Sequence, residues 1–211
     1  MTGGGLGRYS KTMKSSLVYT ILAVVGTAPM FWGLGISVED DAMAPTIETG
    51  DRIWGWPTEA VLPGDIVMIN DPLDPNIPII RRVLAVAGQS IAIDERMIRV
   101  GNRRLRTTAM GDAADYVVTK ETLWAKKPAI GHSWLTRFPK DSSSRWSADP
   151  VSVPEGHVFL MADDRDHAMD SRWWGPVPVE LVRRTIRFRW GASHEWRKKW
   201  EWMVGTQPIR D

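Results

Sequence analysis

The longest uncharged stretch of the chain is an apolar run over residues 16–37, which follows a basic and glycine-rich start. Its length is about what a helix needs to cross a lipid bilayer. Residues 1–15 contain basic side chains and no acid, and acidic residues 39–41 follow the run at once. Because basic residues mark the cytoplasmic side, we expect one transmembrane anchor over 16–37, with the N-terminus in the cytoplasm or matrix. A cleaved signal peptide is the alternative interpretation.

Beyond the apolar run, the pattern of apolar and polar positions predicts a mostly β domain over residues 38–191. Residues 158–161 form a short apolar run that is typical of a buried strand, and residues 182–188 alternate. Residues 62–69 combine a Pro-Gly-Asp turn with an apolar strand. Residues 90–105 alternate around two turn signals, which indicates short antiparallel strands in a hairpin meander.

The C-terminal tail, residues 192–211, has a different pattern. Trp196, Trp200 and Met203 recur at helical spacing beside the basic residues 197–199. We expect a helix here, and two interpretations stay open for it. It is either an amphipathic helix on a membrane surface or a partner, or a terminal helix packed on its own domain.

Composition narrows the possible functions. The chain has 211 residues and no cysteine, which rules out disulfides and thiolate metal sites. A net charge of +2 is too small to argue for nucleic acid as a partner. The 12 tryptophans suit membrane or protein interfaces, although an aromatic core would account for part of them. The four histidines show no metal-ligand spacing, so we expect neither a metal nor a cofactor.

Three stretches resemble the signature boxes of the type I signal peptidases. Residues 162–178 follow the pattern G-D-N-R-D-N-S-x-D-S-R-x-W-G-x-V-P, residues 42–51 follow S-M-x-P-T-L-x-x-G-D, and residues 79–88 follow the box that carries the catalytic lysine. The matching positions are Met43, Pro45, Thr46, Gly50, Asp51, Arg82, Val83, Gly88, Asp163, Arg165, Asp166, Asp170, Ser171, Arg172, Trp174, Gly175, Val177 and Pro178.

The resemblance implies a fold and an activity. The fold would be a twisted antiparallel β-sheet domain tethered by one N-terminal helix, with a variable insertion at about residues 106–150. The activity would be a serine–lysine protease that cuts signal peptides. In that chemistry a neutral lysine activates the serine, a second serine holds the lysine amine, and a hydroxyl and a backbone N–H receive the oxyanion.

The catalytic groups that the resemblance implies are absent from this sequence. Ala42 stands at the nucleophile position, Arg81 at the general-base position and Ala168 at the orienting-serine position. An arginine stays protonated and cannot act as the base. Asp40 and Asp41 occupy positions where acids would repel a developing oxyanion. We therefore hypothesise a pseudoenzyme that retains Met43, Pro45, Asp163, Arg165, Asp170, Ser171 and Arg172 as cleft and scaffold residues.

Two contacts follow from this hypothesis. Asp170 and Arg172 should pair and hold the final loop, as the resemblance implies. A buried Arg81 should find a carboxylate, and Asp41, Asp164 and Asp170 are the candidates. His167, beside Asp166, offers a rival catalytic centre, but the sequence supplies no obvious nucleophile for it.

Three functions compete, in this order. The first is an accessory or structural subunit of a membrane protein complex, with the lipid bilayer and other membrane proteins as partners. The second is a non-cleaving binder of extended signal peptides, or a regulator of an active peptidase. The third is a working protease, if Ala42 is an introduced change. In each case we expect a single-pass protein of a bacterial or organelle inner membrane, with its main domain on the periplasmic or outer side.

Overall fold

The computed structural model describes residues 35–57, 60–113, 115–124, 131–141, 147–190 and 201–202. The chain divides into two compact units, Met1–Ile36 and Ser37–Asp211, and the account below concerns the second. Nearly all of the apolar run over 16–37 lies outside the described residues. Within the described ranges no helix has the length and apolar character that a membrane span requires.

The domain is mostly β, as the sequence predicts, and its largest sheet has the order β1-β2-β14-β3-β4-β12-β13, with β15 paired to β14. The pairs whose register is known in this sheet are antiparallel. Its strands are β1 (Ile36–Ser37), β2 (Arg52–Trp56), β3 (Ile66–Asn70), β4 (Pro78–Val86), β12 (His157–Met161), β13 (Val177–Pro178), β14 (Val182–Trp190) and β15 (Glu201–Trp202).

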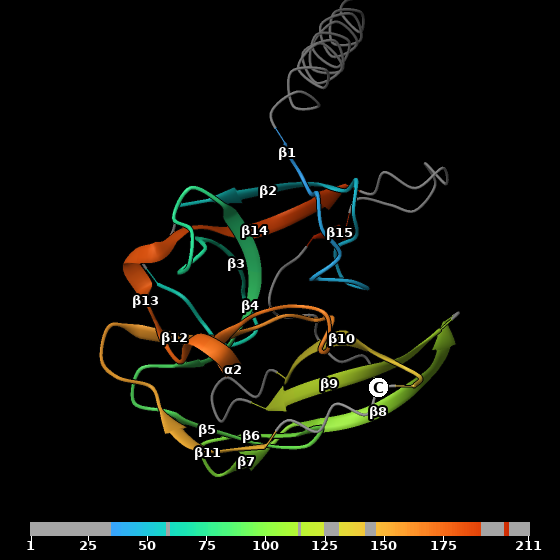
Figure 1. Cartoon of the computed structure of the whole chain (residues 1–211), viewed down its shortest axis with the longest axis vertical. Helices are drawn as coiled ribbons and strands as arrows, with labels where there is room; N and C mark the ends of the chain where they lie inside the picture. Colours follow the sequence, from blue (N-terminus) through green and yellow to red (C-terminus); the bar gives the residue numbers. More distant parts are fainter. Residues whose placement is uncertain are drawn as a thin grey trace, which may run out of the picture. The chain divides into compact units, whose positions relative to one another are not determined.

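Two smaller antiparallel sheets complete the domain (Figure 1). One has the order β11-β5-β6-β7 and the other the order β10-β9-β8. In Figure 1 the first of them lies at the foot of the view, and α2 and β12 lie between it and the upper strands β2 and β14. Their strands are β5 (Ser90–Asp94), β6 (Met97–Val100), β7 (Arg103–Arg104), β8 (Arg106–Ala113), β9 (Tyr116–Trp124), β10 (Gly131–Pro139) and β11 (Ser147–Ser152).

Successive side chains of β3 and of β12 belong to different core clusters. On β3, Ile66 and Met68 join one cluster and Val67 and Ile69 join another. On β12, Val158 and Leu160 join the cluster of Val67, whereas Phe159 and Met161 pack with the β5–β6 hairpin. Successive side chains of a strand point to opposite faces, so a strand with core on both faces is apolar throughout. This explains why these two strands are continuous apolar runs in the sequence.

The described helical elements are short. Helix α2 (Ser171–Trp174) follows the final charged loop, and the 3-10 helix η1 (Val179–Leu181) follows β13. Asp170 caps α2, because its carboxylate accepts a hydrogen bond from the Arg172 backbone N–H. The backbones of β2 and β14 lie close together at Gly55, where a Cβ atom would be 2.3 Å from the Thr185 carbonyl oxygen. The position therefore requires glycine.

The structure differs from the sequence predictions at two places. Ile36 and Ser37, the last residues of the expected span, form β1, and Glu201 and Trp202 of the expected tail helix form β15. In the tail, backbone pairing of Glu201 with Arg189 and of Trp202 with Phe188 replaces local helical bonding. The rest of the expected tail helix lies outside the described residues. The segment over 106–150, for which no secondary structure was predicted, contains β8, β9, β10 and the start of β11.

Candidate functional site

The three positions that the family chemistry would use lie around one loop, residues 163–170. Ala42 lies in a turn after β1 and is 9% exposed, and its carbonyl oxygen accepts a hydrogen bond of 3.0 Å from the Asp164 backbone N–H. Ala168 is a half-buried residue of the loop itself. Arg81 on β4 reaches the loop through Met169. The sequence-predicted site positions are therefore brought together.

Arg81 is 5% exposed, and backbone carbonyls hold its guanidinium. Its Nε donates to the Met169 carbonyl oxygen at 2.9 Å and its Nη1 to the Ile80 carbonyl oxygen at 2.6 Å. The expected ion pair with Asp41, Asp164 or Asp170 is wrong, because in the described part of the chain Arg81 makes none. Those three acids are bound elsewhere, to Thr49, Arg137 and Arg172 respectively.

Burial lowers the pKa of Arg81, since desolvation disfavours its charge, and the nearby carboxylates of Asp40, Asp170 and Asp71 oppose this effect. Among these carboxylates, Asp40 has the largest effect on the pKa of Arg81. A guanidinium nonetheless keeps its proton in proteins. The group at the general-base position is thus a fixed cation that holds the loop backbone.

Asp40 lies beside the nucleophile position and binds its backbone N–H. Its Oδ1 accepts a hydrogen bond of 3.2 Å from the Ala42 backbone N–H. That N–H belongs to the nucleophile position, where the family chemistry directs a backbone donor at the oxyanion. The donor is already satisfied here by a carboxylate, which also places negative charge at the same point. The neighbouring Asp41 accepts hydrogen bonds from the backbone N–H and the hydroxyl of Thr49. These two hydrogen bonds lower the pKa of Asp41.

Buried ion pairs hold the final loop against the rest of the domain. Arg82, 4% exposed, donates from Nε to Asp163 Oδ1 at 2.8 Å and from Nη2 to Asp163 Oδ2 at 2.6 Å. Thr46 also donates to Asp163, and the third donor of Arg82 reaches the Gly64 carbonyl oxygen. This bidentate geometry, fully hydrogen-bonded, is the arrangement that makes a buried pair favourable.

The expected pair of Asp170 and Arg172 is confirmed. Arg172 donates from Nε and Nη2 to the two Asp170 oxygens, each at 2.8 Å. Asp170 also accepts from the Ala162 backbone N–H, and Ser171 Oγ accepts from the Leu160 backbone N–H at 3.0 Å. Both side chains therefore bind the loop and α2 to β12. Met43 is 1% exposed within a core cluster, and Pro45 follows it in the turn over a cis peptide bond.

Sequence reasoning missed two partners of the final loop, both within the segment 106–150. Glu121 on β9 accepts from Arg165 Nη2 at 2.5 Å, and burial raises the pKa of Glu121 although Arg165 opposes this. Arg137 on β10 pairs with Asp164 at 2.7 Å. No motif marks Glu121 or Arg137, because pairing between distant strands is what brings each to the loop.

His167 lies at the surface of the loop, and the carboxylate that contacts its ring is Asp164, with 3.2 Å from Nδ1 to Oδ1. Tyr116 lies edge-on to the ring, at 6.1 Å between centroids. These contacts hold the imidazole but supply no nucleophile for it. Within the residues that the structure describes, no group of three or more His, Asp or Glu side chains could hold a metal ion.

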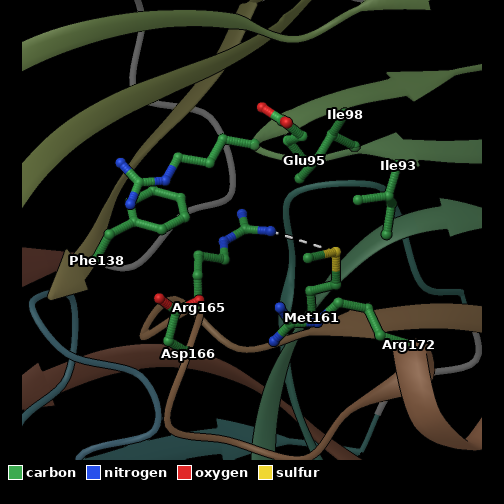
Figure 2. Close-up of a pocket in the computed structure, with 9 residues that line it drawn as sticks. Ile93, Glu95, Ile98, Phe138, Met161, Arg165, Asp166 and Arg172 are labelled. Carbon is green, nitrogen blue, oxygen red and sulfur yellow. Dashed lines mark hydrogen bonds between the residues drawn. The ribbon is translucent and has the colours of Figure 1, made fainter. Parts of the chain in front are cut away.

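A small cavity adjoins the loop on its other side (Figure 2). Its walls are apolar side chains of β5, β6, β10 and β12 together with charged side chains of the 94–97 turn, the final loop and α2. The lining residues are Ile93, Glu95, Arg96, Ile98, Phe138, Met161, Arg165, Asp166 and Arg172.

These features define the class: a β domain with the scaffold of a serine–lysine peptidase and altered catalytic positions. The family model described as "Signal peptidase, peptidase S26" matches residues 10–191. The chain belongs to this family of signal peptidases.

Individual relatives agree with this membership. Signal peptidase I of Rickettsia prowazekii (strain Madrid E) is 31% identical over 137 residues, which covers 62% of this chain and 52% of the relative. Signal peptidase I of Pseudomonas fluorescens is 26% identical over 125 residues, covering 56% and 42%. The chain thus spans about half the length of these curated relatives. A crystal structure of a signal peptidase I from Enterococcus faecalis V583 aligns with a TM-score of 0.39 and 17% identity, covering 60% of this chain and 97% of that chain.

Proposed function

We propose that this chain is a non-catalytic member of the signal peptidase family that serves as an accessory or structural subunit of a membrane protein complex. It would be anchored by residues 16–37 in a bacterial or organelle inner membrane, with the β domain on the periplasmic or outer side. The observation that carries the proposal is the hydrogen bond from the Ala42 N–H to Asp40. It occupies the oxyanion donor at a position that also lacks a nucleophile.

Peptide cleavage by this family's route needs an oxygen nucleophile, a neutral base and free oxyanion donors. Ala42 offers no oxygen atom. Arg81 is a cation bound to the Met169 and Ile80 carbonyls, so it has no lone pair with which to accept a proton. Asp40 adds a negative charge where negative charge would develop. Restoring one group leaves the other obstacles in place.

The buried ion pairs of the final loop support a retained scaffold. Two of these pairs join separate segments of the domain: Arg82 with Asp163 joins β4 to the final loop, and Arg165 with Glu121 joins that loop to β9. The third, Arg172 with Asp170, fixes the start of α2. A domain that keeps its architecture without its chemistry is suited to contact other proteins.

A second candidate function is non-cleaving recognition of an extended signal peptide, or regulation of an active peptidase. The pairing of β4 favours it. Residues 79–82 pair with β3, whereas pairing with β12 begins at Arg82 and runs to Val86. Among the described residues, the first part of β4 therefore has a strand on one side only. An added peptide strand could pair with the other side.

A cleavage assay separates the non-catalytic proposal from a working protease. The purified full chain, its Ala42→Ser variant and the combined Asp40→Ser, Ala42→Ser, Arg81→Lys and Ala168→Ser variant are incubated with a precursor ending in Ala-x-Ala. An active signal peptidase I serves as positive control. We expect no cleavage by the chain or by Ala42→Ser. Cleavage by the chain itself, or by Ala42→Ser alone, would overturn the proposal, because the residues at the other positions would then support catalysis. Cleavage by the combined variant alone would show only that the site is otherwise intact.

A pull-down in gentle detergent with mass spectrometry separates the two non-catalytic roles. A stoichiometric set of membrane proteins supports the subunit. Co-purification of secretory precursors would favour the peptide-binding function instead. The absence of any co-purifying protein, together with saturable binding of an Ala-x-Ala peptide, would favour it as well. Arg81→Met is the matched variant for that binding assay, because it alters the cleft at β4 and leaves the Arg82 pair intact.

A further inference from the structure

The first part of strand β4 has an open edge, and the direction of its backbone groups follows from Val83. The Val83 N–H donates to the Asp65 carbonyl oxygen and the Val83 carbonyl oxygen accepts from the Gly64 N–H, each at 2.8 Å, so both groups point to the β3 side. Backbone groups of successive residues in an antiparallel strand point alternately to its two sides, so those of Ile80 point away from β3. Pairing with β12 ends at Arg82. Among the described residues, no strand therefore pairs with Ile80 on that side.

The Arg81 guanidinium covers the free acceptor of this edge. Its Nη1 donates to the Ile80 carbonyl oxygen at 2.6 Å, and its Nε donates to the Met169 carbonyl oxygen at 2.9 Å. The guanidinium therefore bridges β4 and the final loop, and only 5% of the residue is exposed. A strand that is added along β4 needs the Ile80 carbonyl oxygen as the acceptor for one of its own N–H groups. Because the guanidinium already lies at hydrogen-bond distance from that oxygen, the added strand would have to displace it.

Two features keep the guanidinium at the edge. The Met169 carbonyl oxygen holds Nε from the side of the final loop. The carboxylates of Asp40, Asp170 and Asp71 lie near enough to favour the charged form of Arg81, which keeps all of its N–H donors. Inward-pointing charged side chains on an open edge are one means by which native sheets prevent pairing with another chain. Arg81 has this arrangement on its own strand.

We propose that Arg81 closes the edge of β4 to extended peptides, as an intramolecular cap on the Ile80 carbonyl oxygen. The side chain at the general-base position thus also prevents the strand addition by which a peptide would bind here. This inference goes beyond the subunit role, because it concerns access to the cleft and holds whichever complex the chain joins. It predicts that the unchanged chain does not recognise peptides along this edge.

Fluorescence anisotropy of a labelled Ala-x-Ala peptide tests the cap in the purified full chain. Arg81→Met frees the Ile80 carbonyl oxygen and should bind the peptide about tenfold more tightly than the unchanged chain, the size expected for one added hydrogen bond. Arg183→Met is the matched control, because it removes one positive charge from an exposed position of β14 and should bind like the unchanged chain. Equal affinity of Arg81→Met and the unchanged chain, or binding by neither, would overturn the proposal.

A peptide that is methylated on its backbone nitrogens gives a second readout, because it has no N–H to donate to a strand edge. It should not show the gain in Arg81→Met, which separates strand pairing from an effect of the lost charge. The unchanged chain should bind both peptides equally, and its tighter binding of the unmethylated peptide would overturn the cap without any variant. Mass spectrometry of the peptide afterwards detects cleavage. A cut peptide would contradict the proposed function, whereas tight binding of an uncut peptide by the unchanged chain contradicts the cap alone.

Discussion

Arg81 and Arg82 are neighbours on β4 with nearly the same burial, 5% and 4% exposed, yet they are held in opposite ways. Successive residues of a strand face opposite sides, so the two guanidinium groups enter different surroundings. Arg82 has a bidentate carboxylate partner in Asp163, whereas among the described residues the hydrogen bonds of Arg81 go to the carbonyl oxygens of Met169 and Ile80. Arg82 is thus held by a matched opposite charge, whereas the cation of Arg81 is bound by backbone carbonyl dipoles.

The difference teaches how a catalytic position can be altered while the fold persists. An ion pair that joins β4 to the final loop is needed for the loop to stay in place, whatever the chemistry above it. Under the proposed non-catalytic function, the general-base position carries no such requirement. Asp40 completes this change, because it lies near Arg81 and takes the Ala42 N–H.

The largest expected effect comes from Arg82→Met. The substitution leaves Asp163 buried, at 0% exposure, without its counterion, and breaking a buried pair in this way costs about 3–5 kcal/mol. The free energy of unfolding, measured by urea denaturation, should fall by that amount. Arg183→Met is the control, since Arg183 is an exposed residue of β14 with one side-chain bond to Asn70. A loss below about 1 kcal/mol for Arg82→Met would remove the contrast between the two arginines.

The same substitution at Arg81 should have a small effect. Arg81→Met removes two hydrogen bonds to carbonyl oxygens, but it also removes the cost of burying a charge without a counterion. The two terms offset each other to within about 1 kcal/mol. Urea denaturation of Arg81→Met and Arg82→Met side by side measures the contrast directly. Equal losses in the two variants would mean that Arg81 has a carboxylate partner after all.

The smallest expected effect is a pH dependence at His132 on β10, a half-buried imidazole that, unlike the Arg81 guanidinium, can change its protonation state. Burial lowers the pKa of His132 below its usual 6.5, and Asp65 opposes this in part. Below pH 6.5 the unfolded chain then binds more protons than the folded one. The contribution to stability is complete above that pH and decreases as the pH falls towards the folded pKa.

Thermal midpoints between about pH 5.5 and 7.5 should test this dependence, since His titrates in that range. The slope of the midpoint with pH should flatten in His132→Gln. Ser133→Ala, a neighbouring change without a titrating group, should keep the slope. A slope that is unchanged in His132→Gln would place the titration elsewhere.

Much of the fold follows from local patterns. The apolar run over 158–161 corresponds to β12, and the turn and strand over 62–69 correspond to β3. The alternating stretch over 90–105 contains β5 to β7, and the one over 182–188 lies in β14. Local alternation specifies which residues of a strand share a face, and turn residues specify where a strand stops. The segment 106–150 could not be predicted in this way, since its strands β8, β9 and β10 have weaker alternation and pair over long hairpins.

The sequence by itself determined the family boxes and the identity of the residues at the catalytic positions. Ala42, Arg81 and Ala168 lack the chemistry in any conformation, because their side chains lack the atoms or the lone pair. The resemblance carried by the final box also implied the Asp170–Arg172 pair, which the structure contains.

Only the tertiary structure decided what holds Arg81, which N–H donates to Asp40, and which residues pair with Arg165 and Asp164. Those contacts join β4, the turn after β1, β9 and β10 to one loop. Several acids compete for each arginine in the sequence, and the choice depends on which strands are adjacent and which face each side chain takes. Electrostatic pairing is a property of distance and burial, and neither quantity is set by spacing along the chain.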